Sequence, residues 1–123
     1  MDFRQIEYTH LMENLIYNEL CLRGYSVDVG QFIKNVKNAN GNSMRQSLEV
    51  DFVCNKGSNR IYIQSALSLD TEEKMQQELR SLSSISDNYP KIIIVGGMQP
   101  TYRNDSGIQI LNISDFLLNE NVF

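Results

Sequence analysis

Residues 48–66, LEVDFVCNKGSNRIYIQSA, constrain the fold most strongly, because they predict two strands joined by a short turn. The turn at 55–59 is rich in Asn and Gly and favours an antiparallel hairpin. Side chains alternate along a strand, so Gln64 and Ala66 share one face of the second strand and Ser65 lies on the other. In the first strand the same rule predicts an apolar face with Leu48, Val50, Phe52 and Cys54 and an opposite face with Glu49, Asp51 and Val53. We therefore expect Asp51 and Gln64 to be neighbours on antiparallel strands.

The remaining segments predict an α/β layer structure with a mixed sheet. Apolar spacing predicts a helix over 5–23 that ends at Gly24, and Asp70 is the expected N-cap of a helix over 71–85. Residues 34–47 are rich in Asn, Ser and Gly and predict a long loop. The other expected elements are a strand over 25–32, a β-branched strand over 91–95, a loop over 96–107, a strand over 108–112 and a helix over 114–118 capped by Ser114.

Length and composition indicate one domain over residues 1–123. No apolar run approaches the roughly 20 residues of a membrane span, and the N-terminal residues lack the apolar region of a signal peptide. We therefore expect a cytoplasmic protein without membrane contact.

Residue types and spacing exclude several chemistries. Cys21 and Cys54 lie far apart in apolar positions and predict buried thiols, and His10 is expected at the surface, so a zinc site is not predicted. No G-x-x-x-x-G-K-[ST] sequence occurs, so this chain carries no P-loop and is not itself the motor of an ATPase.

The chain is acidic, with a net charge of −4 at pH 7 and a pI near 4.9. Because binding to phosphates usually needs a basic face, we expect only weak DNA binding. Lys34, Lys37 and Arg45 form either a small positive rim or an ordinary solvated loop.

The segments ENLIYNELCLRGYSVDVG, LEVDFV, RIYIQSALSL and DNYPKIII, in this order, resemble the C-terminal PD-(D/E)XK nuclease-like domain of predicted AAA+ superfamily ATPases of bacteria and archaea. The resemblance covers nearly the whole chain. It implies a restriction-endonuclease-like core, αβββαβ, with a central mixed sheet flanked by helices. It also implies that the chain is the C-terminal part of a larger ATPase whose ATP-binding domain is its partner in cis.

The resemblance also assigns site positions. Glu13 stands at the first-helix acid, Asp51 at the metal-binding aspartate and Gln64 at the second metal-binding acid, whereas Ala66 stands at the lysine. An amide in place of a carboxylate removes a charge and a strong Mg²⁺ ligand, and the lost lysine removes a cation beside the phosphate. We therefore expect no catalytic residue, and no cofactor or metal in this domain.

These residues favour a non-catalytic accessory domain that recognises nucleic acid or a protein partner. One alternative is a Mg²⁺-dependent DNA endonuclease that uses Glu13, Asp51 and Gln64, with Lys74 as a displaced lysine. A second alternative is a structural module for homo-oligomerisation. Asp51 and Gln64 would serve the fold alone if they only bond each other or the neighbouring backbone.

Overall fold

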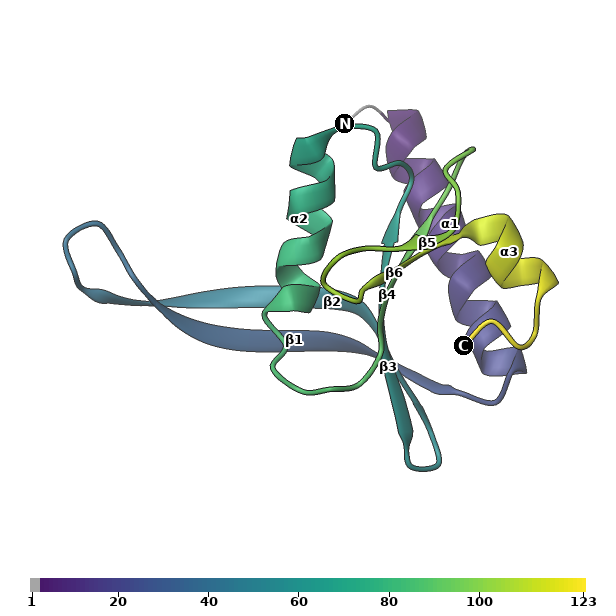
Figure 1. Ribbon diagram of the computed structural model, residues 1–123, viewed down its shortest axis with the longest axis horizontal. Coiled ribbons are helices and arrows are strands. Elements are labelled where there is room, and N and C mark those ends of the chain that lie inside the picture. Colours follow the sequence, from purple (N-terminus) through teal and green to yellow (C-terminus); the bar gives the residue numbers. More distant parts are fainter. Residues whose placement is uncertain (1–2) are drawn as a thin grey trace.

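A six-stranded mixed sheet with helices on both faces forms the structure, a computed structural model that describes residues 3–123 (Figure 1). The strand order is β1-β2-β3-β4-β6-β5; β1, β2 and β3 are antiparallel neighbours, and β4 runs parallel to both β3 and β6. The α/β class and the mixed sheet are as predicted. The elements are α1 (Phe3–Leu22), β1 (Ser26–Lys37), β2 (Ser43–Lys56), β3 (Asn59–Ala66), α2 (Glu72–Ser83), β4 (Lys91–Val95), β5 (Tyr102–Arg103), β6 (Gln109–Asn112) and α3 (Ile113–Leu118).

The sheet separates two apolar cores. Helices α1 and α3 pack on one face, where Ile16, Leu20 and Phe116 are fully buried, and α2 covers the other face with Leu82. The β-branched side chains of β4 pack in both cores: Ile92 and Ile94 face α1, whereas Ile93 and Val95 face α2. A strand covered on both faces reads as a continuous apolar run, as the sequence predicted for 91–95.

The long loop predicted over 34–47 is wrong. These residues extend β1 and β2 into a hairpin that projects beyond the rest of the molecule (Figure 1). Only residues 38–42 turn: Asn38 Oδ1 accepts hydrogen bonds from the backbone N–H groups of Asn40 and Asn42, and Gly41 takes φ +79°. Side-chain bonds from Asn at the turn and cross-strand pairing therefore outweigh the low β propensity of Asn, Ser and Gly.

A β-bulge changes the faces of β2. Val29 alone separates Asp28 from Gly30 in β1, whereas Asp51 and Phe52 both lie between their partners, Val53 and Val50. The extra residue reverses the alternation, so Val50 and Val53 both face α2 while Phe52 and Cys54 face α1. The single apolar face predicted for Leu48, Val50, Phe52 and Cys54 is therefore wrong, and so is the opposite face with Glu49, Asp51 and Val53.

Gly30 allows β1 to pass this bulge. A Cβ atom at Gly30 would lie 2.6 Å from Cγ2 of Val53, closer than carbon atoms can approach without displacement. Only glycine therefore fits opposite Val50 without a shift of the α2 core.

Helix ends match the predictions in part. Gly24 has φ +92° after α1, as expected of a C-terminal cap. Asp70 and Ser114 are not the N-caps: the Thr71 hydroxyl accepts from Lys74 N at the start of α2, and the Asn112 side chain accepts from Ser114 N at α3. Each cap therefore lies one or two residues from the predicted position. The two-residue strand β5 falls inside the predicted loop over 96–107.

Helix α1 buries fewer apolar residues than its spacing predicts. Met12, Ile16 and Leu20 are buried, but Leu11 is 57% exposed and Leu22 is 82% exposed. Cys54 is buried as predicted, Cys21 is exposed against the prediction, and His10 is exposed as predicted. Within residues 3–123, no helix is long and apolar enough to cross a membrane.

Candidate functional site

Asp51, Gln64 and Ser65 meet where β2 and β3 separate, and we call these three residues the fork. The regular ladder between the two strands ends at the pair Phe52 and Ile63. Beyond it, the Asp51 backbone N–H donates to Oε1 of Gln64 at 2.9 Å, and Oδ2 of Asp51 accepts from the Ser65 N–H at 2.9 Å and the Ser65 hydroxyl at 3.1 Å. Side chains thus take the place of the next backbone bonds, and the prediction that Asp51 and Gln64 are neighbours on antiparallel strands is confirmed.

Glu13 lies on α1 within electrostatic reach of the fork. Partial burial raises the pKa of Glu13 above its ordinary value, and the charges of Asp51 and, to a smaller extent, Glu49 raise it further, while His10 opposes the rise. Of the three positions that the sequence singled out, Asp51 and Gln64 are therefore in direct contact, whereas Glu13 interacts with Asp51 through its charge from the α1 side and Gln64 lies on the α2 side.

Glu78 on α2 is a further acid at the fork that the sequence analysis missed. Burial raises the pKa of Glu78, a hydrogen bond from Gln64 lowers it, and the Asp51 charge raises it again. The sequence does indicate this position: Glu78 directly precedes Leu79, which belongs to the apolar stripe of the helix, so its carboxyl group lies at the margin of the core. Asp51 is thus influenced by acids from helices on both faces of the sheet.

The raised pKa of Glu78 predicts a pH dependence of stability. The folded chain binds the Glu78 proton more tightly than the unfolded chain does, so the stabilisation is complete below the ordinary pKa of 4.5 and is lost as pH rises through the higher folded value. We expect Glu78→Gln to raise the free energy of unfolding at pH 7 and to have little effect at pH 4, as measured by urea denaturation. Glu73→Gln, an exposed acid on the same helix, is the control and should lack this pH-dependent gain. Equal effects of Glu78→Gln at both pH values would contradict the prediction.

A cleft of about 230 Å³ opens beside the fork, between the end of β3 and the two helices α1 and α2. Ser65 and Ala66 form its strand side, and Lys74 and Glu78 line it from α2. Ala66 therefore leaves open space in the cleft at the position where the sequence resemblance led us to look for a lysine. The Lys74 ammonium group lies 3.6 Å from Oδ1 of Asp70 and 3.3 Å from the Ser68 hydroxyl, which hold it at the rim of the cleft.

The fork is a poor metal site. The described residues contain no group of three His, Cys, Asp or Glu side chains placed to hold a metal ion. One oxygen of Asp51 already accepts two hydrogen bonds from Ser65, and Gln64 supplies an amide oxygen that is engaged by the Asp51 N–H. Divalent cations such as Mg²⁺ prefer carboxylate and phosphate oxygens, so these donors do not fit a resident ion.

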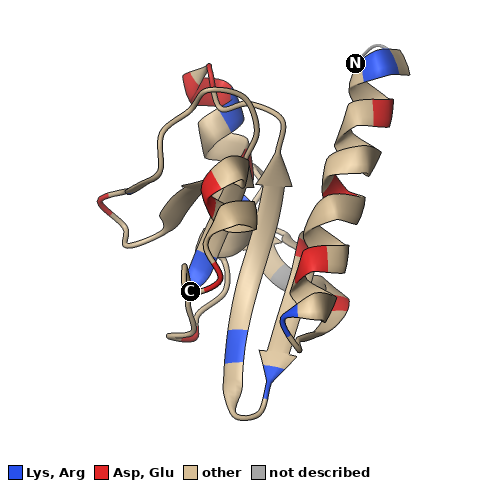
Figure 2. Ribbon diagram, turned by 90° about the vertical axis from the view of Figure 1, so that its right-hand side faces the viewer, with Lys and Arg blue, Asp and Glu red and all other residues tan. Residues whose placement is uncertain are grey.

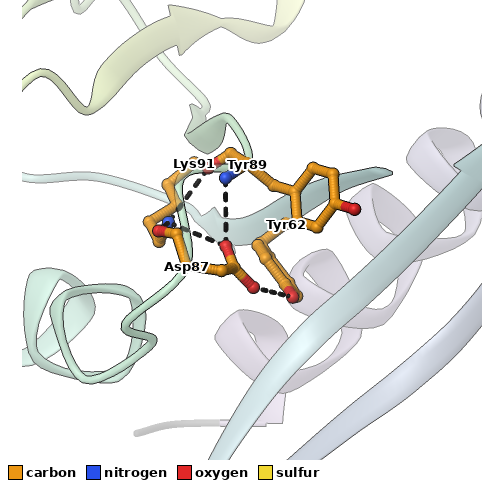
Figure 3. A network of polar contacts seen from close by, with 4 residues as sticks. All are labelled: Tyr62, Asp87, Tyr89 and Lys91. Atoms are coloured by element: carbon orange, nitrogen blue, oxygen red, sulfur yellow. Dashed lines mark hydrogen bonds and ion pairs between the residues drawn. The ribbon is translucent and has the colours of Figure 1, made fainter. Parts of the chain in front are cut away.

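A second polar cluster lies at the other end of β3 and supports the fold. The buried Tyr62 donates its hydroxyl proton to Oδ2 of Asp87 at 2.5 Å, and the Lys91 ammonium group donates to the backbone oxygens of Asp87 and Tyr89 (Figure 3). The hydrogen bonds from Tyr62, Tyr89 and Lys91 lower the pKa of Asp87 despite partial burial. These contacts hold the connection from α2 to β4 in place, and we propose no catalytic or binding role for them.

Acidic and basic side chains lie in different places around the β2–β3 hairpin. Bands of Asp and Glu follow α1, whereas Lys and Arg lie close to the turn between β2 and β3 (Figure 2). Those cations are engaged in local contacts: Lys56 donates to the Arg23 carbonyl oxygen, and Arg60 donates to the Asn55 side chain. The cations of the hairpin turn are therefore held away from the fork, and the cleft beside the fork is lined by one cation, Lys74, and one acid, Glu78.

Together, the fold and the fork define an α/β domain with a polar cleft beside the end of a central strand. The chain matches no family model. It is 33% identical over 111 residues to an uncharacterized protein of Haemophilus influenzae. This similarity spans 90% of the chain but 24% of the length of that relative.

Proposed function

We propose that this chain is a nuclease-like, non-catalytic accessory domain that recognises nucleic acid or a protein partner for an ATPase domain in cis. The observation that carries the proposal is the fork, where Asp51 is engaged by Ser65 and where Gln64 and Ala66 stand at positions that would need an acid and a lysine for cutting. A nuclease-like site that lacks the second acid and the lysine favours recognition over hydrolysis.

The order of the elements supports a restriction-endonuclease-like core. Helix α1 precedes the antiparallel strands β1, β2 and β3, and α2 then crosses over to β4, which lies parallel to β3. Glu13 of α1 and Glu78 of α2 lie within electrostatic reach of Asp51 from opposite faces of this sheet. The αβββαβ arrangement is the one that the resemblance implies.

The length of the Haemophilus relative is compatible with a larger protein that also contains an ATPase domain. The similarity occupies 24% of that protein, so about three quarters of it has space for an ATP-binding domain. We propose the same context for this chain, with the ATPase as the partner that uses the recognition domain.

The test is a cleavage assay with the purified chain. We expect labelled duplex and branched DNA to remain intact with Mg²⁺ or Mn²⁺, because the fork lacks a second carboxylate ligand and a cation beside the phosphate. Asp51→Asn is the control that separates a contaminating nuclease from the chain itself. Cleavage that Asp51→Asn abolishes would contradict the non-catalytic proposal and favour the endonuclease alternative, with Lys74 as the next residue to replace.

One observation favours the oligomerisation alternative. Four apolar residues of α1 are exposed at the spacing of one helix face, and strand β1 is an edge of the sheet: the residues are Tyr8, Leu11, Leu15 and Leu22. Sedimentation of the chain across a range of concentrations tests this alternative. A monomer at all concentrations would contradict it.

A further inference from the structure

We propose that the projecting end of the β1–β2 hairpin, residues 31–47, is a two-stranded arm that binds the major groove of duplex DNA. We call these residues the arm. The inference rests on the proposed function, because it assigns nucleic acid as the partner and a specific element as the contact surface. The cleavage assay above and the binding assay below test the two separately.

The arm differs in charge from the rest of the chain. Residues 29–48 contain three cations, Lys34, Lys37 and Arg45, and no Asp or Glu, although Asp28 and Glu49 flank them directly. The rest of the chain has eight Lys and Arg against 15 Asp and Glu and therefore carries a net charge of −7. A positive arm on an acidic body attracts a polyanion to the arm and repels it from the body.

Two cations share one face of the arm. Asn35 pairs with Arg45 and Lys37 pairs with Ser43, and residues that pair directly or lie two apart in a strand point to the same side. Lys37, Arg45 and Asn35 are all exposed, whereas the side chain of Lys34 lies outside the part that the structure describes. Within the described residues, no ion pair engages Lys37 or Arg45.

The other arm side chains supply donors and acceptors. Gln31, Ile33, Arg45 and Ser47 line a shallow hollow on this same face, and Gln46 is exposed on the opposite one. Amide and hydroxyl groups contact phosphates and base edges, and Ile33, which is 65% exposed, offers an apolar surface to a thymine methyl group. An acid-free surface with Asn, Gln, Ser and two cations suits DNA better than a protein partner.

The dimensions also fit. Paired strands lie about 4.8 Å apart and rise about 3.3 Å per residue, so the arm is about 20 Å long and narrow enough for a B-DNA major groove about 12 Å wide. Helix α2 covers the base of the hairpin, where Phe32 and Leu48 pack near Ile85, and the end of the arm extends beyond it (Figure 1). The major groove of duplex RNA is too narrow and deep for such an arm, which selects DNA.

The test measures binding of a labelled 20-base-pair DNA duplex by fluorescence anisotropy in a series of salt concentrations. We expect the unmodified chain to bind in the micromolar range at low salt and to lose most binding at physiological salt, because few cations are available. Lys37→Ala combined with Arg45→Ala should weaken binding at low salt by about tenfold or more and reduce the slope of log K against log salt by about 2. Because both side chains are exposed, the thermal unfolding midpoint should be unchanged.

The matched control is Arg4→Ala combined with Arg80→Ala. These exposed arginines lie on α1 and α2, and their removal changes the net charge by the same amount. The control should alter DNA affinity less than about twofold. Equal losses in the two double variants would overturn the proposal, since binding would then follow net charge alone.

Three other results would also overturn it: no duplex bound at low salt, duplex RNA bound as well as DNA, or an arm variant that changes the oligomeric state but not DNA binding. None of these results affects the non-catalytic proposal, which depends on cleavage. Sub-micromolar affinity at physiological salt would contradict the expected weak binding but would support the arm if the double variant abolished it.

Discussion

Asp51→Ala is expected to lower the free energy of unfolding by about 2 kcal/mol, because it removes the acceptor for a half-buried backbone N–H and a hydroxyl group of Ser65. Asp51→Asn keeps an acceptor oxygen and should cost about half as much. The measurement is urea denaturation at pH 7, with the exposed neighbour Glu49→Ala as a control that should cost less than about 0.5 kcal/mol.

The sign of this effect distinguishes the two roles of Asp51. Acids kept for catalysis or metal binding are often held at a cost to stability, so their removal stabilises the fold. Asp51 lies near Glu13 and Glu78, and its charge raises the pKa of both, so repulsion already opposes its presence. A more stable Asp51→Ala variant would mean that this repulsion outweighs the bonds to Ser65, and would favour a functional acid over a structural one.

Gln64→Glu combined with Ala66→Lys is expected to give the fork a metal-dependent stability that the unmodified chain lacks. The new carboxylate would lie beside Asp51 and Glu78, so without a divalent cation the unfolding midpoint should fall. With Mn²⁺ at about ten times its dissociation constant, binding should return about 1.4 kcal/mol. Thermal unfolding with and without Mn²⁺ measures this difference.

The same double variant is the smallest change that should allow trace DNA cleavage. Glu at position 64 would supply the second metal ligand, and Lys at position 66 would point into the open cleft beside the attacked phosphate. Each group is worth on the order of a few kcal/mol in a preorganised site. Gln77→Glu combined with Ala66→Lys makes the same charge changes but places the new carboxylate on α2, outside the fork, and should give neither metal-dependent stability nor cleavage. A metal-dependent stabilisation of equal size in this control would show that the fork has no special geometry.

Much of the site was predictable because it depends on local rules. Alternation along β3 predicted that Gln64 and Ala66 share one face, and the short turn fixed the pairing that brings Asp51 beside Gln64. Gly24 ends α1 because glycine, without a side chain, adopts positive φ easily. None of these features needs information from distant parts of the chain.

The features that were missed depend on tertiary contacts. The arm pairs Asn-rich residues that have little strand propensity of their own, and only the bonds around Asn38 show why they turn there. The apolar stripe of α2 places Glu78 at the margin of the core, but Glu78 reaches the fork only because α2 packs over β3. The bulge at Asp51 depends on Gly30 in another strand, and its only sequence signal is a glycine inside a strand pattern.

The bulge at Asp51 also limits how the length of β2 can change in evolution. Because Asp51 and Phe52 together lie opposite Val29 alone, loss of one residue here would remove the bulge and leave Val50 and Val53 on the α2 face and Cys54 on the α1 face. Both cores would keep their valine and cysteine side chains, and the fork would lose its geometry. A deletion in a part of β2 without a bulge would instead exchange the faces of every residue on one side of it. The bulge is therefore the place in the middle of β2 that can lose one residue, whereas the turn at 38–42 and its flanking pairs can shorten or lengthen without disturbing either core.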